Sequence, residues 1–345
     1  MRIGIVSSMV PHVDGGYRTF VNQLVPHLES AGHQVERIWL PFSGDPNSML
    51  AEIAGFRMMD LENVCDRVIC CRPPAHAIKH SQKVIWFIHH ERIFYDLWDS
   101  EYNPIPKTAY WEKFRQTLFD LDKRTLEEAH LVFANSRVVA SRLHHFNGIH
   151  AEVLYPPIDN PVVVESLGYG SELLFICRIE HHKRQHLAIQ AMAMTQTPVR
   201  LRIAGASQNL AYLASLHEEV QRNGLQDRVT VDGRWISEGE KHHLLAQALG
   251  VVYLPLDEDS YGYPTLEGAS ARRATVSAHD SGGVSEFIVD GQCGLLTEPT
   301  PSALAEAFDR LWLDRGLAER LGAAAQARVC TLGINWEHVV ARLTA

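Results

Sequence analysis

The chain has 345 residues, roughly twice the usual length of one domain, and 46% of them are hydrophobic, which is enough for two cores. Lys and Arg number 32 against 41 Asp and Glu. The net charge of −9 argues against a nucleic-acid-binding protein, which normally carries a basic surface. The six cysteines form no C-x-x-C pair, and every apolar run falls well short of the ~18 residues that span a bilayer. We therefore expect reduced thiols and a cytoplasmic protein.

Short apolar runs alternate with helix-period segments along the whole chain. In the first half we predict helices at 17–31 and 109–129, and strands at 2–7, 34–40, 67–71, 84–88 and 131–134. In the second half we predict strands at 172–176, 200–204, 228–232, 250–254 and 274–277, and helices at 183–194, 208–223, 238–247, 264–272 and 302–313. This alternation is typical of parallel sheets covered by helices on both faces.

A proline-rich stretch separates the two halves. The stretch 154–161 contains Pro156, Pro157 and Pro161, which stiffen the chain and prevent a helix. The predicted fold class is therefore α/β, with two doubly wound Rossmann-like domains, 1–156 and 162–330. Such domains usually bind a ligand in the cleft that they face, through the loops that follow the strands.

Glycines and histidines follow two of the strands in the first half. Gly15 and Gly16 precede a helix, where a glycine pair lets the backbone approach a ligand and the helix N-terminus offers N–H groups to an anion. A tight strand-to-helix turn would explain the same pair. His89 and His90 point to opposite sides of an extended chain, so we expect one of them to face a ligand.

Two basic residues and a tryptophan follow strands of the second half. Arg178 and Lys183 can both reach one anion, and a guanidinium with an ammonium suits a diphosphate whose charge grows as it leaves. A solvated charged loop would show the same spacing. Trp235 follows the strand 228–232, where it could cover a base or belong to a core.

The stretch 257–268 is the densest in polar groups. Pro264 suits the first turn of a helix. Asp259 and Glu267 place one carboxylate before that turn and one inside the helix, where they suit the hydroxyls of a sugar and a ribose. The D-x-D string at 257–259 is too short to indicate a metal site, and no neighbouring residue marks either carboxylate as a glycosidase acid. After strand 274–277, Gly282 and Gly283 repeat the glycine pair.

In this order the motifs resemble those of the retaining nucleotide-sugar glycosyltransferases of family four, the glycosyl transferases group 1, which share the two-domain GT-B fold. The matching pieces are the Gly15-Gly16 loop, Gly32-His33-Gln34-Val35, Asn135-Ser136, a G-R-x-x-x-x-K element at Arg178 and Lys183, an E-x7-E motif at Asp259 and Glu267, and Ser281-Gly282-Gly283 with Glu286 and Gly291. The chain departs from the pattern twice, since Cys177 replaces the usual glycine and Asp259 the first Glu. Asp is shorter than Glu by one methylene, which moves its carboxylate roughly 1–1.5 Å.

The resemblance implies a donor site in the second domain and an acceptor domain in the first. The catalytic group would comprise Arg178 and Lys183 on the donor diphosphate, with Asp259 and His89 on the transferred sugar. The other donor-binding residues would be Gly15, Gly16, Trp235, Tyr263, Thr265, Glu267, Gly282 and Gly283. The family needs no metal or other cofactor, and its last helix, here 335–345, packs back on the first domain.

The acceptor side is the least defined part of the prediction. His90, Tyr95 and Trp98 would face an unknown hydroxyl acceptor, which could be a glycan, a lipid-linked sugar or a small molecule. Peripheral contact with the inner face of a membrane stays open, because the family often modifies lipid-linked acceptors. Two alternatives remain: a GT-B nucleotide-sugar epimerase, and a catalytically silent nucleotide-sugar-binding protein, which the Asp259 departure suggests.

Overall fold

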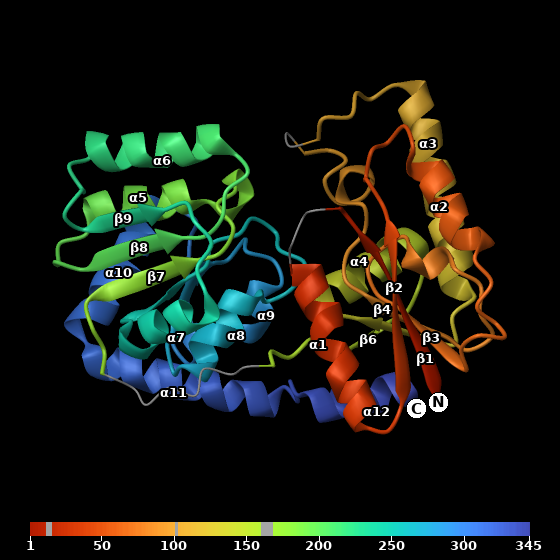
Figure 1. Cartoon of the computed structure of the whole chain (residues 1–345). Helices are drawn as coiled ribbons and strands as arrows, with labels where there is room; N and C mark the ends of the chain where they lie inside the picture. Colours follow the sequence, from red (N-terminus) through yellow and green to blue (C-terminus); the bar gives the residue numbers. More distant parts are fainter. Residues whose placement is uncertain (12–15, 101–102, 160–167) are drawn as a thin grey trace. The chain divides into compact units, whose positions relative to one another are not determined.

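The computed structural model describes residues 1–11, 16–100, 103–159 and 168–345 (Figure 1). The chain divides into two compact units. Unit 1 comprises Met1–Pro157 together with Asn335–Ala345, and unit 2 comprises Ile158–Ile334.

Unit 1 is built on a parallel sheet with the strand order β2-β1-β3-β4-β5-β6. Its described strands are β1 (Arg2–Met9), β2 (Gln34–Pro41), β3 (Arg67–Cys70), β4 (Lys83–Phe87), β5 (Leu131–Ala134) and β6 (Glu152–Val153). Its helices are α1 (Gly16–Ser30), α2 (Met49–Met58), α3 (Ala109–Glu127), α4 (Arg137–Asn147) and α12 (Trp336–Thr344), with single turns η1 (Ala75–Ala77) and η2 (Arg92–Phe94).

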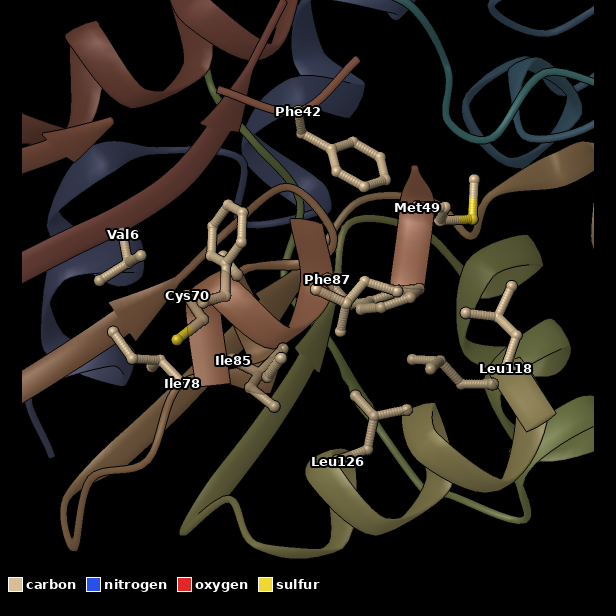
Figure 2. Packing of buried hydrophobic residues seen from close by; sticks show 14 of the residues in the cluster. Val6, Phe42, Met49, Cys70, Ile78, Ile85, Phe87, Leu118 and Leu126 are labelled. Carbon is tan, nitrogen blue, oxygen red and sulfur yellow. The ribbon is translucent and has the colours of Figure 1, made fainter. Parts of the chain in front are cut away.

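Hydrophobic side chains fill both faces of this sheet. Successive residues of β4 alternate between two clusters: Val84 and Trp86 belong to the cluster under α1 and α12, whereas Ile85 and Phe87 belong to the one under α2, α3 and α4. Figure 2 shows the second cluster from close by, with Phe87 at its centre. Burial on both faces explains why the strands are near-continuous apolar runs.

The C-terminal helix α12 belongs to unit 1, although 177 residues of unit 2 precede it in the chain. Its Trp336 ring stacks on His27 of α1 at 4.8 Å between centroids and meets Trp86 edge-on at 6.4 Å. Arg67 Nη1 donates hydrogen bonds to the carbonyls of Leu343 (3.0 Å) and Ala345 (2.8 Å), which caps the helix end.

Unit 2 is a second parallel sheet, with the strand order β12-β11-β10-β7-β8-β9. Its described strands are β7 (Glu172–Ile176), β8 (Arg200–Ala204), β9 (Val229–Asp232), β10 (Gly250–Val252), β11 (Thr275–Ala278) and β12 (Gly294–Thr297). Its helices are α5 (Gln185–Met194), α6 (Leu210–Arg222), α7 (Glu238–Gln247), α8 (Tyr263–Ser270), α9 (Val284–Phe287), α10 (Pro301–Leu313) and α11 (Arg315–Thr331), with the turn η3 (His181–Lys183).

The order of these strands creates a topological switch point in unit 2. The chain runs outward from β7 through β8 to β9, and then returns to the other side of β7 to form β10, β11 and β12. At such a point the loops after two adjacent parallel strands diverge to opposite faces, and ligands of open α/β sheets bind there. The loops after β7 and β10 therefore mark where a ligand site is expected.

The predicted strands are all present, and the α/β class is confirmed. Two strands were not predicted, β6 and β12, and neither were the helices α2, α4, α9 and α11. The helix predicted from 183 begins later, at Gln185, because Arg184 has a φ of +58° and interrupts the helical path.

Candidate functional site

Arg178 and Lys183 occupy the loop after β7, at the switch point of unit 2, in very different environments. The Arg178 side chain is exposed and has no hydrogen-bond or ion-pair partner among the described residues. Lys183 is only 6% exposed, so its ammonium group lies inside the protein. The Arg178 guanidinium is thus available at the surface, whereas the Lys183 ammonium is buried.

The ammonium of Lys183 is held by residues of the neighbouring loop, after β10. Its Nζ donates a hydrogen bond to the hydroxyl of Tyr253 at 3.1 Å and forms an ion pair with the carboxylate of Glu258. The Tyr253 hydroxyl donates to the same Glu258 oxygen at 3.2 Å. Burial and the Glu258 charge raise the pKa of Tyr253 well above its usual value, so the hydroxyl stays protonated and can donate.

Arg184, which the sequence motif does not include, joins three loops of unit 2. Its guanidinium makes two 2.7 Å bonds to the carboxylate of Asp280, after β11. The same side chain donates to the carbonyls of Leu254 (2.7 Å) and Pro255 (3.2 Å), after β10. Arg184 is therefore a structural clamp that fixes the backbone next to Lys183.

Gly282 and Gly283 bring the loop after β11 against the acidic segment 257–260. A Cβ on Gly282 would lie 2.4 Å from the carbonyl oxygen of Glu258, and a Cβ on Gly283 would lie 2.6 Å from Cα of Ser260. The Gly283 N–H donates to the Glu258 carbonyl at 2.8 Å. The pair is thus needed for close backbone packing inside unit 2, and this packing positions Asp259 at the same edge of the sheet.

The helix α8 begins directly after this segment. Gly262 precedes it with a φ of +71°, and a Cβ at that position would lie 2.3 Å from the Tyr253 ring. Tyr263 is the first helical residue, followed by Pro264 in the first turn, as expected. Thr265 does not offer polar groups to a ligand, because its N–H bonds the Gly262 carbonyl and its hydroxyl donates to the Tyr261 carbonyl at 2.7 Å. The Thr265 side chain is fully buried and bonded within unit 2, which argues against the expected contact with the donor.

Glu267 of α8 is paired with a lysine that sequence reasoning missed. Lys241 of α7 donates to its carboxylate at 2.7 Å and to Glu238 at 2.8 Å. Glu267 is largely buried, and burial raises its pKa, which the Lys241 charge partly offsets. Both side chains line a small pocket with Leu174, Ile176, Leu245, Val251 and Pro264. The Lys241 side chain fixes one oxygen of Glu267.

Trp235 is 70% exposed in the loop after β9, which excludes a place in the core of unit 2. The preceding Arg234 is held by Asp232 and Glu240, so the base of this loop is fixed. An exposed indole on a fixed loop offers a flat face on which a planar base can stack.

In unit 1 the two histidines after β4 have opposite environments. His89 lies at the edge of the sheet, and its Nδ1 donates to the His90 carbonyl at 2.7 Å, which leaves Nε2 as a hydrogen-bond acceptor. Burial lowers the pKa of His89, so the neutral form is favoured. His90 is 2% exposed and its Nε2 donates to Asn147 at 2.8 Å. His90 is therefore a core residue.

Burial also corrects the expectation that His90, Tyr95 and Trp98 face an acceptor. Tyr95 is 2% exposed, and its ring packs against that of His90 at 4.2 Å between centroids, tilted by 32°. Its hydroxyl donates to Asp122 at 2.5 Å. Trp98 is 6% exposed and stacks on Phe94. His90, Tyr95 and Trp98 are thus buried inside unit 1, because the aromatic-rich segment after β4 packs against α3 and α4.

Two polar residues that sequence reasoning missed lie at the ends of neighbouring strands in unit 1. Arg72 follows β3 and donates to the Ser8 hydroxyl, at the end of β1, at 2.9 Å. Glu91 follows β4, and its Oε1 is buried without a hydrogen-bond partner in the described part of the chain. Burial raises the pKa of Glu91, and the nearby His89 and Arg72 act against that shift.

Gly15 lies outside the described residues, and Gly16 is the first residue of α1. Within the ranges that the structure describes, no three His, Cys, Asp or Glu side chains are grouped closely enough to hold a metal ion. No described helix is long and apolar enough to cross a membrane.

Part of the chain matches a described protein family and named relatives. Residues 169–328, almost all of unit 2, match the family described as Glycosyl transferases group 1. The chain is 30% identical over 125 residues to the alpha-1,3/1,6-mannosyltransferase ALG2 of Dictyostelium discoideum, covering 36% of this chain and 29% of that protein. It is 29% identical over 157 residues to the D-rhamnosyltransferase WbpZ of Pseudomonas aeruginosa, covering 45% and 39%. The chain thus spans less than half the length of these two curated relatives.

Solved structures extend the likeness to the whole fold. The Anabaena protein Alr3699/HepE, crystallised in complex with UDP and glucose, has a TM-score of 0.75 at 16% identity, covering 99% of this chain and 98% of that one. WaaG, a glycosyltransferase involved in lipopolysaccharide biosynthesis, has a TM-score of 0.72 at 14% identity, covering 99% and 100%. At these identities the likeness concerns the fold alone. Residues 169–328 of unit 2 thus form a glycosyl transferases group 1 domain, and the two parallel sheets have the GT-B architecture.

Proposed function

We propose that this protein is a retaining, metal-independent glycosyltransferase that moves a sugar from a nucleotide diphosphate sugar to a hydroxyl acceptor. The observation that carries the proposal is the pair of cations at the switch point of unit 2, Arg178 exposed and Lys183 buried, inside the segment that matches the family. The UDP complexes of the structural neighbour HepE and the transferase names of the relatives support the same donor class.

Each part of the donor has a matching group in unit 2. Lys183 and Arg178 neutralise the diphosphate, and the N-terminus of α8 near Tyr263 adds its dipole. Glu267, fixed by Lys241, accepts hydrogen bonds from the ribose hydroxyls. Trp235 stacks on the base.

In unit 2, the Asp259 carboxylate accepts hydrogen bonds from the hydroxyls of the transferred sugar. In unit 1, the Nε2 of His89 is a hydrogen-bond acceptor that suits a sugar hydroxyl. In the reaction the bond between the anomeric carbon and the diphosphate oxygen breaks, while the acceptor oxygen bonds to the same carbon from the same face. The acceptor proton passes to the leaving phosphate oxygen, so no side chain of the chain acts as a base.

The test is a turnover assay with UDP-, GDP- and TDP-sugars and a panel of hydroxyl acceptors. The proposal expects release of a nucleoside diphosphate together with a glycoside whose anomeric configuration matches that of the donor, without added divalent metal. An inverted product would contradict retention. Conversion of the donor to its epimer, with no glycoside formed, would favour the epimerase alternative, and tight nucleotide binding without turnover of any acceptor would favour the silent binder.

Lys183→Met tests the role of the diphosphate site within the same assay. Methionine keeps the length and the buried packing of the side chain but removes the charge. We expect a fall in kcat/KM of at least about a hundredfold, since a charge-assisted contact that strengthens in the transition state contributes about 3–4 kcal/mol. Wild-type transfer by Lys183→Met would refute the assignment.

A further inference from the structure

The phosphate-binding position proposed for Lys183 already holds an anion of the protein itself. Glu258 forms an ion pair with Lys183 Nζ, and Tyr253 bonds both partners, at 3.1 Å to Nζ and 3.2 Å to the carboxylate. The sequence motif names the next residue, Asp259, as the carboxylate of this loop. The geometry instead places Glu258 on the cation.

The pair is asymmetric in its exposure to solvent. The Lys183 side chain is 7% exposed, whereas that of Glu258 is 22% exposed. A buried ammonium without a counter-ion is strongly unfavourable, so Lys183 needs an anion at all times. Glu258, on the solvent side, is the partner that can leave when another anion arrives.

The backbone under Glu258 is fixed, so this exchange requires only a side-chain rotation. The Asp257 N–H donates to the Asp280 carbonyl at 2.9 Å, and the Glu258 carbonyl accepts from Gly283 at 2.8 Å. On the other side, Leu256 N–H donates to the His182 carbonyl at 2.8 Å. The loop therefore keeps its position while the carboxylate moves.

We propose that Glu258 is a resident counter-ion of Lys183 that the donor diphosphate displaces, and that it thereby sets the affinity of the site for diphosphates. The inference rests on the proposed function, because it takes Lys183 as the phosphate-binding cation. A carboxylate and a phosphate cannot both contact one ammonium without repelling each other. The diphosphate displaces Glu258 because it carries more charge and also reaches Arg178. Glu258 still competes with it for Lys183, which favours release of the nucleoside diphosphate product.

The experiment is a calorimetric titration of inorganic pyrophosphate, which carries the two phosphates without a base or a sugar, into the full chain. The variants are Glu258→Gln, which keeps an oxygen that accepts from Lys183 but removes the charge, and Glu258→Asp, which keeps the charge on a shorter stem. The matched control is Glu180→Gln, which removes one negative charge from the loop that carries Lys183. Among the described residues, the Glu180 side chain makes no hydrogen bond or ion pair with Lys183. Lys183→Met is the reference.

We expect Glu258→Gln to bind pyrophosphate about tenfold more tightly than the wild type, with Glu258→Asp in between and Glu180→Gln within about twofold. Without pyrophosphate, Glu258→Gln should unfold at a lower temperature than the wild type, and pyrophosphate should raise its midpoint more than that of the wild type. Opposite effects on stability and on anion affinity are the signature of displacement, because a purely structural pair would not increase affinity when it is broken.

Equal or weaker binding by both Glu258→Gln and Glu258→Asp would overturn the inference, and so would an equal gain in Glu180→Gln, which would show a general effect of charge. If Lys183→Met loses pyrophosphate binding while Glu258→Gln gains none, this inference alone fails. If Lys183→Met binds pyrophosphate like the wild type, the proposed phosphate role of Lys183 fails with it.

Discussion

Replacing Gly262 by Ala should disturb the Lys183 site through Tyr253. A Cβ at Gly262 would lie 2.3, 2.7 and 2.8 Å from Cε1, Cζ and the hydroxyl oxygen of the Tyr253 ring. Carbon atoms in contact prefer about 3.5–4.0 Å, so the ring must move by roughly 1.2 Å or more. The hydroxyl lies 3.1 Å from Lys183 Nζ, and a shift of that size takes it beyond hydrogen-bond reach.

Two terms contribute to the destabilisation. Placing a side chain at a φ of +71° costs about 1–3 kcal/mol, and forcing a buried ring aside costs a further ~1–3 kcal/mol. Gly224→Ala is the matched control, because Gly224 has a φ of +63° but nothing within 4 Å of a Cβ. Gly224→Ala should therefore lose only the stability that a side chain at positive φ costs.

The assay is urea unfolding of both variants, followed by calorimetric titration with pyrophosphate. We expect Gly262→Ala to lose about 2–6 kcal/mol of unfolding free energy and most of its pyrophosphate affinity. Gly224→Ala should lose about 1–3 kcal/mol and bind as the wild type does. Equal losses of stability and unchanged binding in both variants would refute the link from Gly262 through Tyr253 to Lys183.

Three further predictions test other parts of the account. Lys241→Met removes the charge that offsets the effect of burial on the pKa of Glu267. Nucleotide affinity, measured by calorimetry at several pH values, should fall and should decline further as the pH is lowered from 8 toward 6. A loss that does not depend on pH would indicate a packing effect only. Trp235→Ala should weaken binding of a nucleoside diphosphate by about 1–3 kcal/mol, the usual value of stacking on a base, and leave pyrophosphate binding unchanged. Burial lowers the pKa of His90 to about 4, below its unfolded value near 6.5, so the unfolded state takes up the proton first as the pH is lowered. The free energy of unfolding should therefore decrease by about 2 kcal/mol as the pH is lowered from 7 to 5. His90→Gln, which can still donate to Asn147, should remove that part of the pH dependence in urea unfolding, and an unchanged dependence would contradict the assignment.

The strand pattern of this fold could be predicted from sequence mainly because the central strands of both sheets are buried on both faces. A run such as Leu173–Ile176 is apolar throughout, which makes its position and ends clear. The helix α11 was missed because its buried residues are Ala318, Leu321, Gly322 and Ala325, a small-residue face with weak apolar periodicity. The strand β6 has only two residues, too few for any pattern.

The candidate site could be predicted by residue type and loop, but not by partner. Lys183 and Glu258 are 75 positions apart, and the choice between Glu258 and Asp259 depends on side-chain directions that the packing of Gly282 and Gly283 fixes. The pair of Lys241 and Glu267 joins two helices and has no local signature.

For the two histidines, alternation along the strand predicted that one would face inward. Asn147 and Phe146 of α4, which contact the ring of His90, determine which one does.

The central claim is that unit 2 holds the donor's diphosphate at the carboxyl ends of β7 and β10. The most direct test is a crystal structure of the chain with whichever of UDP, GDP or TDP binds most tightly in calorimetry. The account predicts phosphate oxygens within hydrogen-bond distance of Lys183 Nζ and the Arg178 guanidinium, Glu258 rotated away from Lys183, and the base on Trp235. A nucleotide bound elsewhere, with the pair of Lys183 and Glu258 intact, would contradict it.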